Sequence, residues 1–374
     1  MKYACINPWI SIEADAIGRA KPCCIYQGQI GNFQNDSIAD LWNNDKITSL
    51  RNEFILGNRP KECSQCWQTE DAGGESKRLK DNYKFRKLLS RWHSSPNNVP
   101  YPSYYDLKLG TVCNLKCRTC STASSHKWAE DEIEIYGHVL QEDTTTYWID
   151  DNSPIWNEIS NNLDTVVHFD FSGGEPFLIK RHVVLLKECV KKGVAKNISI
   201  HYNTNGTITP TSEMTNLWQE FKEVNVMISM DSTHDRFNYM RHPANWNIVE
   251  ANYLNLSKIN YIHTSICYTV SIFTLYYIPE FLHYIKSQEI DESSVYFNLM
   301  VFPTYLSIQN IPPKAYSAFV KKLGSYPQCE NFLNIMQANY VNEQEWFLEK
   351  TEQIDVLRKE NWKETFPELH KILL

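Results

Sequence analysis

The stretch Cys113-Asn114-Leu115-Lys116-Cys117-Arg118-Thr119-Cys120 sets three cysteines at the spacing C-x3-C-x2-C. It follows a run, residues 104–112, in which apolar and polar side chains alternate as in a half-buried strand. Three thiolates on one short loop can hold three corners of an iron–sulfur cube, and the fourth iron then stays open to a small molecule. A structural zinc site normally uses four ligands in paired C-x2-C knuckles. The third cysteine therefore favours a cluster that binds a ligand.

The overall composition is that of a well-packed protein from a reducing compartment. The 374 residues include 42% hydrophobic and 22% charged side chains, enough for one large domain and a small one. A net charge of -7 argues against a general nucleic-acid binder, whose phosphate contacts need a basic surface. The chain has neither an apolar run long enough to span a membrane nor a signal region, so we expect a cytoplasmic protein. In that compartment its 11 cysteines are expected to be metal ligands or core thiols rather than disulfides.

Strand-like and helical patterns alternate between residues 104 and 303. The strand-like runs are Tyr104–Val112, Thr165–Phe171, Asn197–Tyr202, Asn225–Met230, His263–Ser271 and Ser294–Val301. The helical runs between them are Ile155–Leu163, Lys180–Lys192, Ser212–Lys222, Ala244–Lys258 and Ile278–Ser287. This alternation predicts an α/β fold with a parallel sheet.

Polar motifs stand where four of these strands end. They are Cys113–Cys120 after the first strand, Ser172-Gly173-Gly174-Glu175-Pro176 after the second, Asn203-Thr204-Asn205-Gly206 after the third and Ser229-Met230-Asp231-Ser232 at the end of the fourth. Parallel barrels bind their ligands at the carboxyl ends of the strands. The four motifs therefore predict a binding site on one rim of a barrel.

The cysteine triplet, together with Gly-Gly-Glu-Pro after the second strand, resembles the radical S-adenosylmethionine (SAM) superfamily. The resemblance implies a partial (β/α)6 TIM-like barrel and a [4Fe–4S] cluster on Cys113, Cys117 and Cys120 whose open iron binds SAM. It also implies that SAM is cleaved reductively to a 5′-deoxyadenosyl radical, which abstracts hydrogen from a substrate. Thr119 stands where relatives commonly have an aromatic residue, so the packing around the adenine is expected to differ.

Several side chains after the strands are candidates for holding SAM. Gly173 and Gly174 lack a Cβ, which lets the backbone approach the methionine amine, and Glu175 supplies acceptors for a cation. Ser229 and Asp231 point the same way on one strand and suit the ribose hydroxyls, unless they cap the next helix. Further candidates are Thr204 and Asn205 for the ribose, with a turn as the alternative, and Arg241 for the carboxylate, with a surface ion pair as the alternative.

A second group of cysteines lies in residues 1–75, near a strand-like run at 9–14 and a helical one at 37–51. Its members are Cys5, the pair Cys23-Cys24, and Cys63 and Cys66. Spacing alone allows a zinc knuckle or an iron–sulfur cluster. The cysteines together with Gly18, Gly31-Asn32 and Leu41-Trp42 resemble the auxiliary-cluster module called SPASM or, when shortened, twitch. The resemblance implies a second [4Fe–4S] cluster on Cys5, Cys23, Cys63 and Cys66, with Cys24 as the alternative to Cys23. In relatives this module usually follows the barrel, whereas here it precedes it.

Two flanking segments are expected to be mainly helical. Residues 76–103 contain a basic amphipathic helix at Lys77–Arg91 and a proline-rich linker. The basic charges form either a solvated face or, as a hypothesis, a dock for an acidic electron donor such as flavodoxin or ferredoxin. Residues 304–374 are expected to form helices that cover the open side of the barrel.

These features predict a radical SAM oxidoreductase-type enzyme that oxidises or crosslinks a peptide or a small polar metabolite. An auxiliary cluster suits an oxidation because it can take the electron that remains on the substrate radical. One alternative is a zinc-stabilised binding protein on a barrel scaffold, without SAM chemistry. A further alternative is an RNA-modifying radical SAM enzyme that acts through the basic helix, which the acidity of the whole chain opposes.

Overall fold

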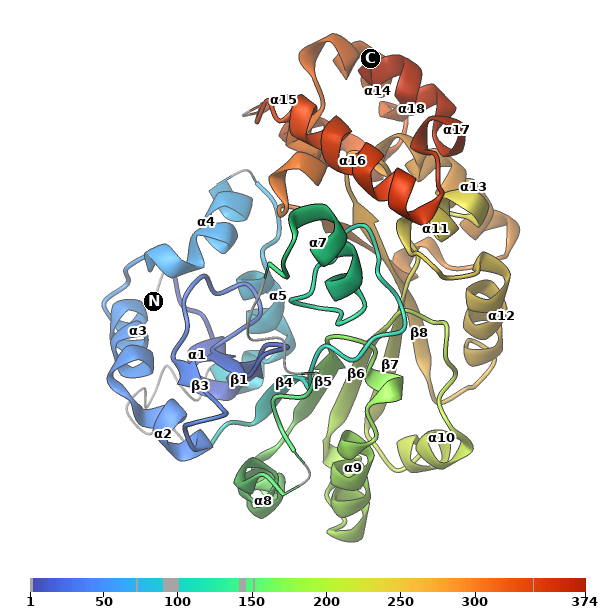
Figure 1. The fold of residues 1–374 in the computed structure, drawn as a ribbon. Coiled ribbons are helices and arrows are strands. Elements are labelled where there is room, and N and C mark those ends of the chain that lie inside the picture. The colour runs from blue at the N-terminus through green and yellow to red at the C-terminus, as the bar shows by residue number, and fades with distance from the viewer. Residues whose placement is uncertain (1–2, 72, 90–100, 141–145, 151, 339) are drawn as a thin grey trace. The chain divides into compact units, whose positions relative to one another are not determined.

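A computed structural model describes residues 3–71, 73–89, 101–140, 146–150, 152–338 and 340–374 (Figure 1). The chain forms two compact units. The first comprises Met1–Val112, Asp143–Asn203 and Pro210–Asn225, and the second comprises Cys113–Glu142, Thr204–Thr209 and Val226–Leu374. The N-terminal cysteine group therefore belongs to the first unit and the cysteine triplet to the second.

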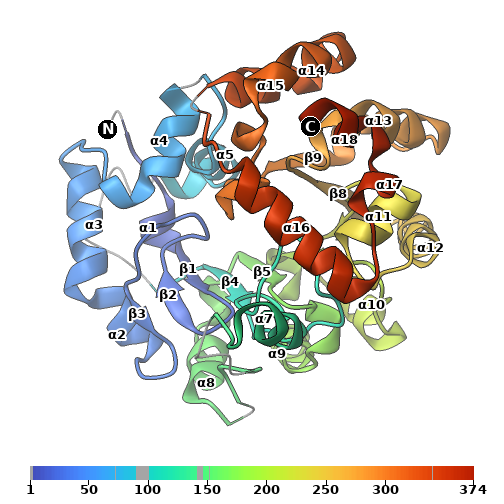
Figure 2. The same ribbon diagram turned by 45° about the horizontal axis from the view of Figure 1, so that its top comes forward.

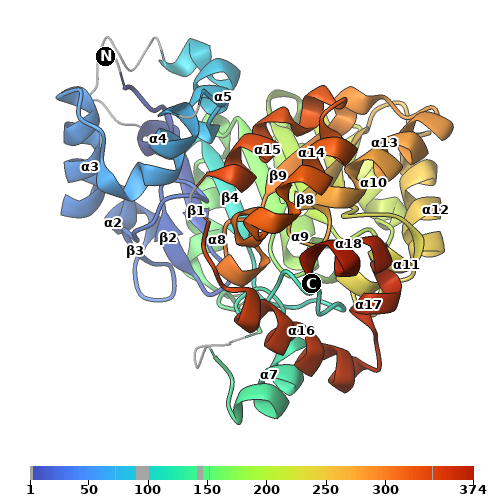
Figure 3. The same cartoon turned by 90° about the horizontal axis from the view of Figure 1, so that it is seen from above.

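The first unit is built on a sheet with the strand order β3-β2-β1-β4-β5-β6. The strands are β1 (Ser11–Ala14), β2 (Arg19–Lys21), β3 (Gly31–Asn32), β4 (Tyr104–Lys108), β5 (His168–Ser172) and β6 (Ser199–Thr204). Strand β1 runs parallel to β4, β4 parallel to β5, and β5 parallel to β6, whereas β2 and β3 are antiparallel to their neighbours. Figure 3 shows β1 beside β4, so the N-terminal segment extends the sheet that begins the predicted barrel.

The apolar face of this sheet packs on helices of the same unit. These helices are α8 (Pro154–Asn161), α9 (Arg181–Lys191) and α10 (Ser212–Trp218). The ring of Phe171 in β5 lies 4.8 Å from that of His182 in α9, and the ring of Tyr202 in β6 lies 5.1 Å from that of Trp218 in α10. Burying these aromatic side chains supplies much of the hydrophobic stabilisation of the unit.

Short helices surround β1–β3 in the first unit. They are α1 (Asn7–Ile10), α2 (Ile38–Asn43), α3 (Asp45–Ile55), α4 (Ser64–Asp71) and α5 (Lys77–Lys84). The predicted strand over residues 9–14 is wrong at its start: Pro8 stands in the first turn of α1, where its fixed φ favours a helix. The single helix predicted over residues 37–51 is two helices, because Asn44 leaves helical geometry and its side chain caps α3.

The predicted basic helix at Lys77–Arg91 is only partly solvated. Helix α5 ends at Lys84, and residues 90 and 91 lie outside the described part of the chain. Arg78 is 6% exposed and makes hydrogen bonds within the unit, so it does not belong to a solvent-facing stripe. The exposed basic residues of this segment begin at Lys80.

The second unit contains β7 (Glu223–Ser229) from Val226 onward, followed by β8 (His263–Val270) and β9 (Val295–Leu299). These strands follow the order β7-β8-β9, and β8 and β9 are parallel. The helices are α7 (Trp128–Tyr136), α11 (His234–Met240), α12 (Trp246–Leu256), α13 (Ile278–Ser287), α14 (Tyr316–Leu323), α15 (Glu330–Gln337), α16 (Gln344–Arg358), α17 (Trp362–Thr365) and α18 (Pro367–Leu373).

The C-terminal helices pack into the core of the second unit. The ring of Phe273 lies 5.1 Å from that of Phe347 in α16 and 5.2 Å from that of Phe366. Figure 2 shows α16 beside α7, where Arg358 donates to Asp131 at 2.8 Å. The C-terminal segment is therefore an integral part of this unit.

The predicted α/β class with a parallel sheet is confirmed. Parallel strands alternate with helices in both units, and α13 has the bounds that the sequence predicts. Helices α7 and α11 were not predicted. Within the described ranges, every helix falls short of the length and apolar character that crossing a membrane requires.

Candidate functional site

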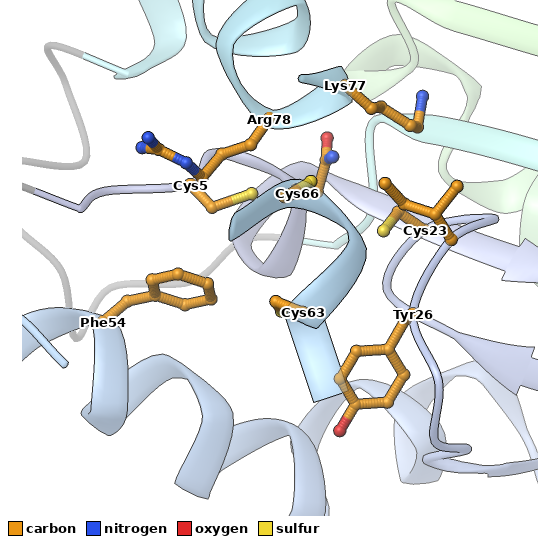
Figure 4. A pocket seen from close by; sticks show the side chains of 10 residues that line it. Cys5, Cys23, Tyr26, Phe54, Cys63, Cys66, Lys77 and Arg78 are labelled. Atoms are coloured by element: carbon orange, nitrogen blue, oxygen red, sulfur yellow. The ribbon is translucent and has the colours of Figure 1, made fainter. Parts of the chain in front are cut away.

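Four cysteines of the first unit surround one pocket (Figure 4). They are Cys5, Cys23, Cys63 and Cys66. The pocket has a volume of about 300 Å³, part of it open to solvent. The other residues of its wall are Asn7, Ile25, Tyr26, Phe54, Lys77 and Arg78. The four thiols come from three segments that are far apart in the sequence, so only the fold brings them together.

The backbone on either side of Cys5 is fixed by helix α5. The side chain of Asn82 accepts a hydrogen bond from the N–H of Ile6 at 2.8 Å and donates one to the carbonyl of Ala4 at 2.8 Å. Arg78 also donates to the Ala4 carbonyl, at 2.6 Å, and forms a two-pronged ion pair with Glu70 of α4. These contacts tie Cys5 to α4, the helix that carries Cys66.

The adjacent cysteines Cys23 and Cys24 occupy different surroundings. Cys23 lines the pocket, whereas Cys24 is not among the residues of its wall. The electrostatic neighbours of Cys24 are Lys77 of α5 and three residues on strands of the sheet, Asp106, Glu13 and Lys108. The sequence offers no signal that separates two adjacent cysteines, because the turn after β2 decides which thiol faces the pocket.

The four cysteines of the pocket supply the sulfur donor that metal centres in proteins use most often. Among the described residues, no three cysteine, histidine or carboxylate side chains converge closely enough to chelate a single metal ion. Burial raises the pKa of all four thiols, that of Cys63 to about 12. Thiol ligands must lose their protons to bind metal, so occupation of this pocket is linked to proton release.

In the cysteine triplet of the second unit, the sulfur atoms of Cys113 and Cys117 lie close to N–H donors. The sulfur of Cys113 accepts from the N–H of Leu115 at 3.4 Å and from the side-chain amide of Asn205 at 3.8 Å. The sulfur of Cys117 lies 4.0 Å from a guanidinium nitrogen of Arg241. Donors and positive charge directed at sulfur stabilise thiolate ligands.

Neighbouring segments of the second unit hold this loop in place. The N–H of Lys116 donates to the carbonyl of His242 and that of Arg118 to the carbonyl of Met240, both at 2.8 Å. Arg118 is 3% exposed, and its guanidinium pairs with Asp355 of α16 and lies 3.6 Å from the ring centroid of Tyr239. The sequence analysis did not single out Arg118, since an arginine within a metal-binding loop gives no signal of where its side chain points.

The residues Gly173, Gly174 and Glu175 lie in the first unit. Gly174 and Glu175 pack against Val112, the residue that precedes Cys113. A Cβ on Gly174 would stand 2.2 Å from the carbonyl oxygen of Val112, and the N–H of Glu175 donates to that oxygen at 2.7 Å. Both glycines have positive φ, +77° for Gly173 and +54° for Gly174. This turn therefore needs glycine in order to pack against Val112. The sequence analysis explained the two glycines by the approach of SAM and did not predict this packing requirement.

Replacing Gly174 by Ala should destabilise this turn strongly. The new methyl group would have to displace the Val112 carbonyl, and the positive φ adds strain, so we expect a loss of roughly 3 kcal/mol or more in the free energy of unfolding. Gly57→Ala is the matched control, because Gly57 has φ +77° but no atom within 4 Å of its Cβ position. The control should lose only about 1 kcal/mol. Equal losses in denaturant unfolding would show that φ, rather than the contact with Val112, makes Gly174 necessary.

The remaining predicted SAM contacts lie in the second unit, where two of them pair with each other. Arg241 forms an ion pair with Asp231 at 2.8 Å, and Asp231 is 0% exposed. The surface ion pair considered for Arg241 is therefore wrong, because this pair is buried. Asp231 also accepts the N–H of Thr269 at 2.8 Å and does not cap α11, whose N-cap is Thr233. Asp231 thus positions Arg241 close to Cys117.

The predicted ribose candidates differ in their surroundings. The hydroxyl of Thr204 accepts the N–H of Gly206 at 3.1 Å, as expected of a turn. Asn205 joins this turn to the cysteine loop, since its amide donates to the side-chain oxygen of Asn114 at 2.9 Å as well as to Cys113. Ser229 is the last residue of β7 and is half-buried.

Two family models match the segments that contain the cysteine groups. A family model described as an iron–sulfur cluster-binding domain, SPASM, matches residues 5–67, and a model of the radical SAM superfamily matches residues 107–285. This chain belongs to the radical SAM superfamily. Its SPASM domain stands at the N-terminal side of the radical SAM domain, as the sequence predicted. Membership implies an enzyme, and the two domains imply [4Fe–4S] clusters and SAM as cofactors.

Solved structures of radical SAM proteins resemble this chain distantly. Native anSMEcpe with bound AdoMet is 21% identical, with 62% of each chain covered and a TM-score of 0.43. The protein SuiB of Streptococcus suis, bound to S-adenosylmethionine, is 14% identical, with 82% of this chain and 67% of that chain covered and a TM-score of 0.42. SuiB bound to its precursor peptide SuiA gives 14% identity, 81% and 66% coverage, and a TM-score of 0.43. The chain thus spans 62% of the length of the anSMEcpe structure. Among curated proteins, none matches.

Proposed function

We propose that this radical SAM enzyme uses two [4Fe–4S] clusters to oxidise or crosslink a peptide or a small polar metabolite. The observation that carries the proposal is the pocket in the first unit, where Cys5, Cys23, Cys63 and Cys66 face one cavity. A second complete set of thiols suits an oxidation, in which an electron must leave the substrate. The other cluster would be held by Cys113, Cys117 and Cys120, with SAM on the iron that has no protein ligand.

The residues of the second unit would shape the environment of the SAM cluster. Leu115, Asn205 and Arg241 direct N–H groups at sulfur, which stabilises thiolate charge at Cys113 and Cys117. Asp231 keeps the guanidinium of Arg241 in place and offsets its burial. When bound, SAM and its cluster supply hydrogen-atom abstraction, and the auxiliary cluster supplies an electron acceptor.

Different residues are proposed to bind the methionine portion and the ribose of SAM. We assign the methionine portion to the backbone around Gly173 and Gly174 with Glu175. We assign the ribose to Ser229 and to the turn at Thr204 and Asn205. Glu175 is 0% exposed and its carboxylate already accepts the N–H of Phe177 at 3.1 Å, which fixes its orientation. A fixed acceptor loses little freedom when a ligand binds.

Anaerobic SAM cleavage tests this proposal. The reconstituted full-length chain, supplied with SAM and dithionite, should form 5′-deoxyadenosine, and the same mixture without dithionite should form none. The product is quantified by liquid chromatography. A chain that carries about eight irons yet leaves SAM intact would contradict the proposed activity while leaving the clusters in place.

A further inference from the structure

The polar face of the sheet in the first unit carries a row of carboxylates from three neighbouring strands. Glu13 of β1 stands opposite Asp106 of β4, and Asp106 stands opposite Asp170 of β5. Residues in register on parallel strands share a face, and this face is opposite to that of Leu107 and Phe171. We call Glu13, Asp106 and Asp170 the carboxylate row.

The hydrogen bonds of the carboxylate row leave acceptors unused. The ammonium of Lys108 pairs with Oε1 of Glu13 and with Oδ1 of Asp106, the latter at 3.2 Å. The hydroxyl of Tyr104 donates to Oδ2 of Asp170 at 3.2 Å. Among the described residues, Oε2 of Glu13 and Oδ1 of Asp170 are buried and receive no hydrogen bond, and Glu13 is 1% exposed. A buried acceptor without a donor is unfavourable, so the row is complete only with a donor from outside.

Two lysines of α5 act electrostatically on the row, Lys77 on Asp106 and Lys84 on Asp170, but their side-chain contacts are with residues outside it. The ammonium of Lys77 pairs with Asp81 at 3.0 Å, and that of Lys84 lies 3.2 Å from Nε2 of His168. The carboxylates also act on one another: burial raises the pKa of Asp106 to about 7, Lys108 opposes this rise, and Glu13 and Asp170 add to it. An additional cation beside the row would relieve the repulsion among the three carboxylates.

The carboxylate row borders the pocket of the auxiliary cysteines. Lys77 lines that pocket, and its ammonium lies 5.8 Å from the ring centroid of Tyr104, a residue on the face of the row. The electrostatic neighbours of Cys24 include Glu13 and Asp106. A group held by the row would therefore lie near the proposed electron acceptor, inside one compact unit.

We propose that the carboxylate row binds an amine or guanidinium group of the substrate, the chemistry of a lysine or arginine side chain or of a small alkylamine. This inference rests on the proposed function and narrows its substrate class. The row needs N–H donors and positive charge, and these two groups supply both. The N-terminal segment then has a second role besides holding cysteines, because it contributes Glu13 to the substrate face.

Binding of small cations tests this inference without turnover. The probes are n-butylamine and butylguanidine, both cationic at neutral pH, with n-butanol as the neutral comparison. Their dissociation constants are measured by ligand-observed NMR on the full-length, anaerobically reconstituted chain with SAM. We expect Glu13→Gln and Asp170→Asn each to weaken binding of the cations about tenfold, because one charged hydrogen-bond acceptor is lost. Glu220→Gln, at an exposed carboxylate of the same unit, should leave the constants unchanged.

The outcomes separate this inference from the proposed function. Asp170→Asn leaves the ion pairs of Lys108 intact, so it remains informative if Glu13→Gln fails to fold, as judged by circular dichroism and iron content. Equal binding of n-butanol and n-butylamine, or unchanged constants in folded Asp170→Asn protein, would overturn the carboxylate row as a cation site. Cation binding that depends on the row in a chain that never cleaves SAM would instead overturn the proposed function and leave the site.

Discussion

Changing Cys113, Cys117 and Cys120 together to Ala is expected to abolish SAM cleavage and to remove about half of the iron. The triplet provides the thiolates proposed for the SAM cluster, and alanine offers no replacement ligand. Iron should fall from about eight atoms per chain to about four, because the four cysteines of the first unit remain. No 5′-deoxyadenosine should form under dithionite. Iron analysis and chromatography of the anaerobic protein measure both effects.

The matched control removes a cysteine that neither group contains. Cys329 is 0% exposed, and burial raises the pKa of its thiol to about 12, as expected of a core residue. Cys329→Ala should keep all of the iron and the SAM cleavage activity. Formation of 5′-deoxyadenosine by the triple variant at the wild-type rate would show that the SAM cluster has other ligands.

Replacing the adjacent cysteines Cys23 and Cys24 one at a time is expected to change the iron content very differently. Cys23→Ala should lose most of the iron of the auxiliary cluster, about four atoms, because Cys23 lines the pocket with Cys5, Cys63 and Cys66. Cys24→Ala should keep that iron, since Cys24 is not part of the pocket wall. Each variant serves as the control of the other, because both remove one thiol from the same turn.

Iron content and the low-temperature electron paramagnetic resonance spectrum of the reduced variants measure this difference. The Cys23→Ala protein should retain the signal of the SAM cluster and the cleavage of SAM to 5′-deoxyadenosine. Loss of the auxiliary iron from Cys24→Ala, with normal iron in Cys23→Ala, would reverse the assignment of the ligand.

The sequence predicted the strands and helices of the fold better than their local interruptions. Periodicity of apolar residues gives α13 at Ile278–Ser287, because burial on one face determines that helix. It missed the break at Asn44, where a local side-chain cap outweighs the continuing pattern. It also did not predict that β1 pairs with β4, because strand pairing between residues 11–14 and 104–107 leaves no local signal.

For the candidate site, the sequence identified residue types and spacing but not pairing. The cysteine groups stood out through their spacing, and the family matches cover both of them. The ion pair between Asp231 and Arg241, and the place of Asn205 beside Cys113, depend on side-chain directions that the fold sets. The same holds for the carboxylate row, whose members are 93 and 64 residues apart in sequence and meet only through strand register.

The metal content of the anaerobically purified wild-type chain tests the central claim of two clusters most directly. The account predicts about eight irons and eight sulfides per chain, with the brown absorption of [4Fe–4S] clusters. A colourless chain that carries zinc after anaerobic reconstitution would contradict it and would support the zinc-stabilised binding protein instead.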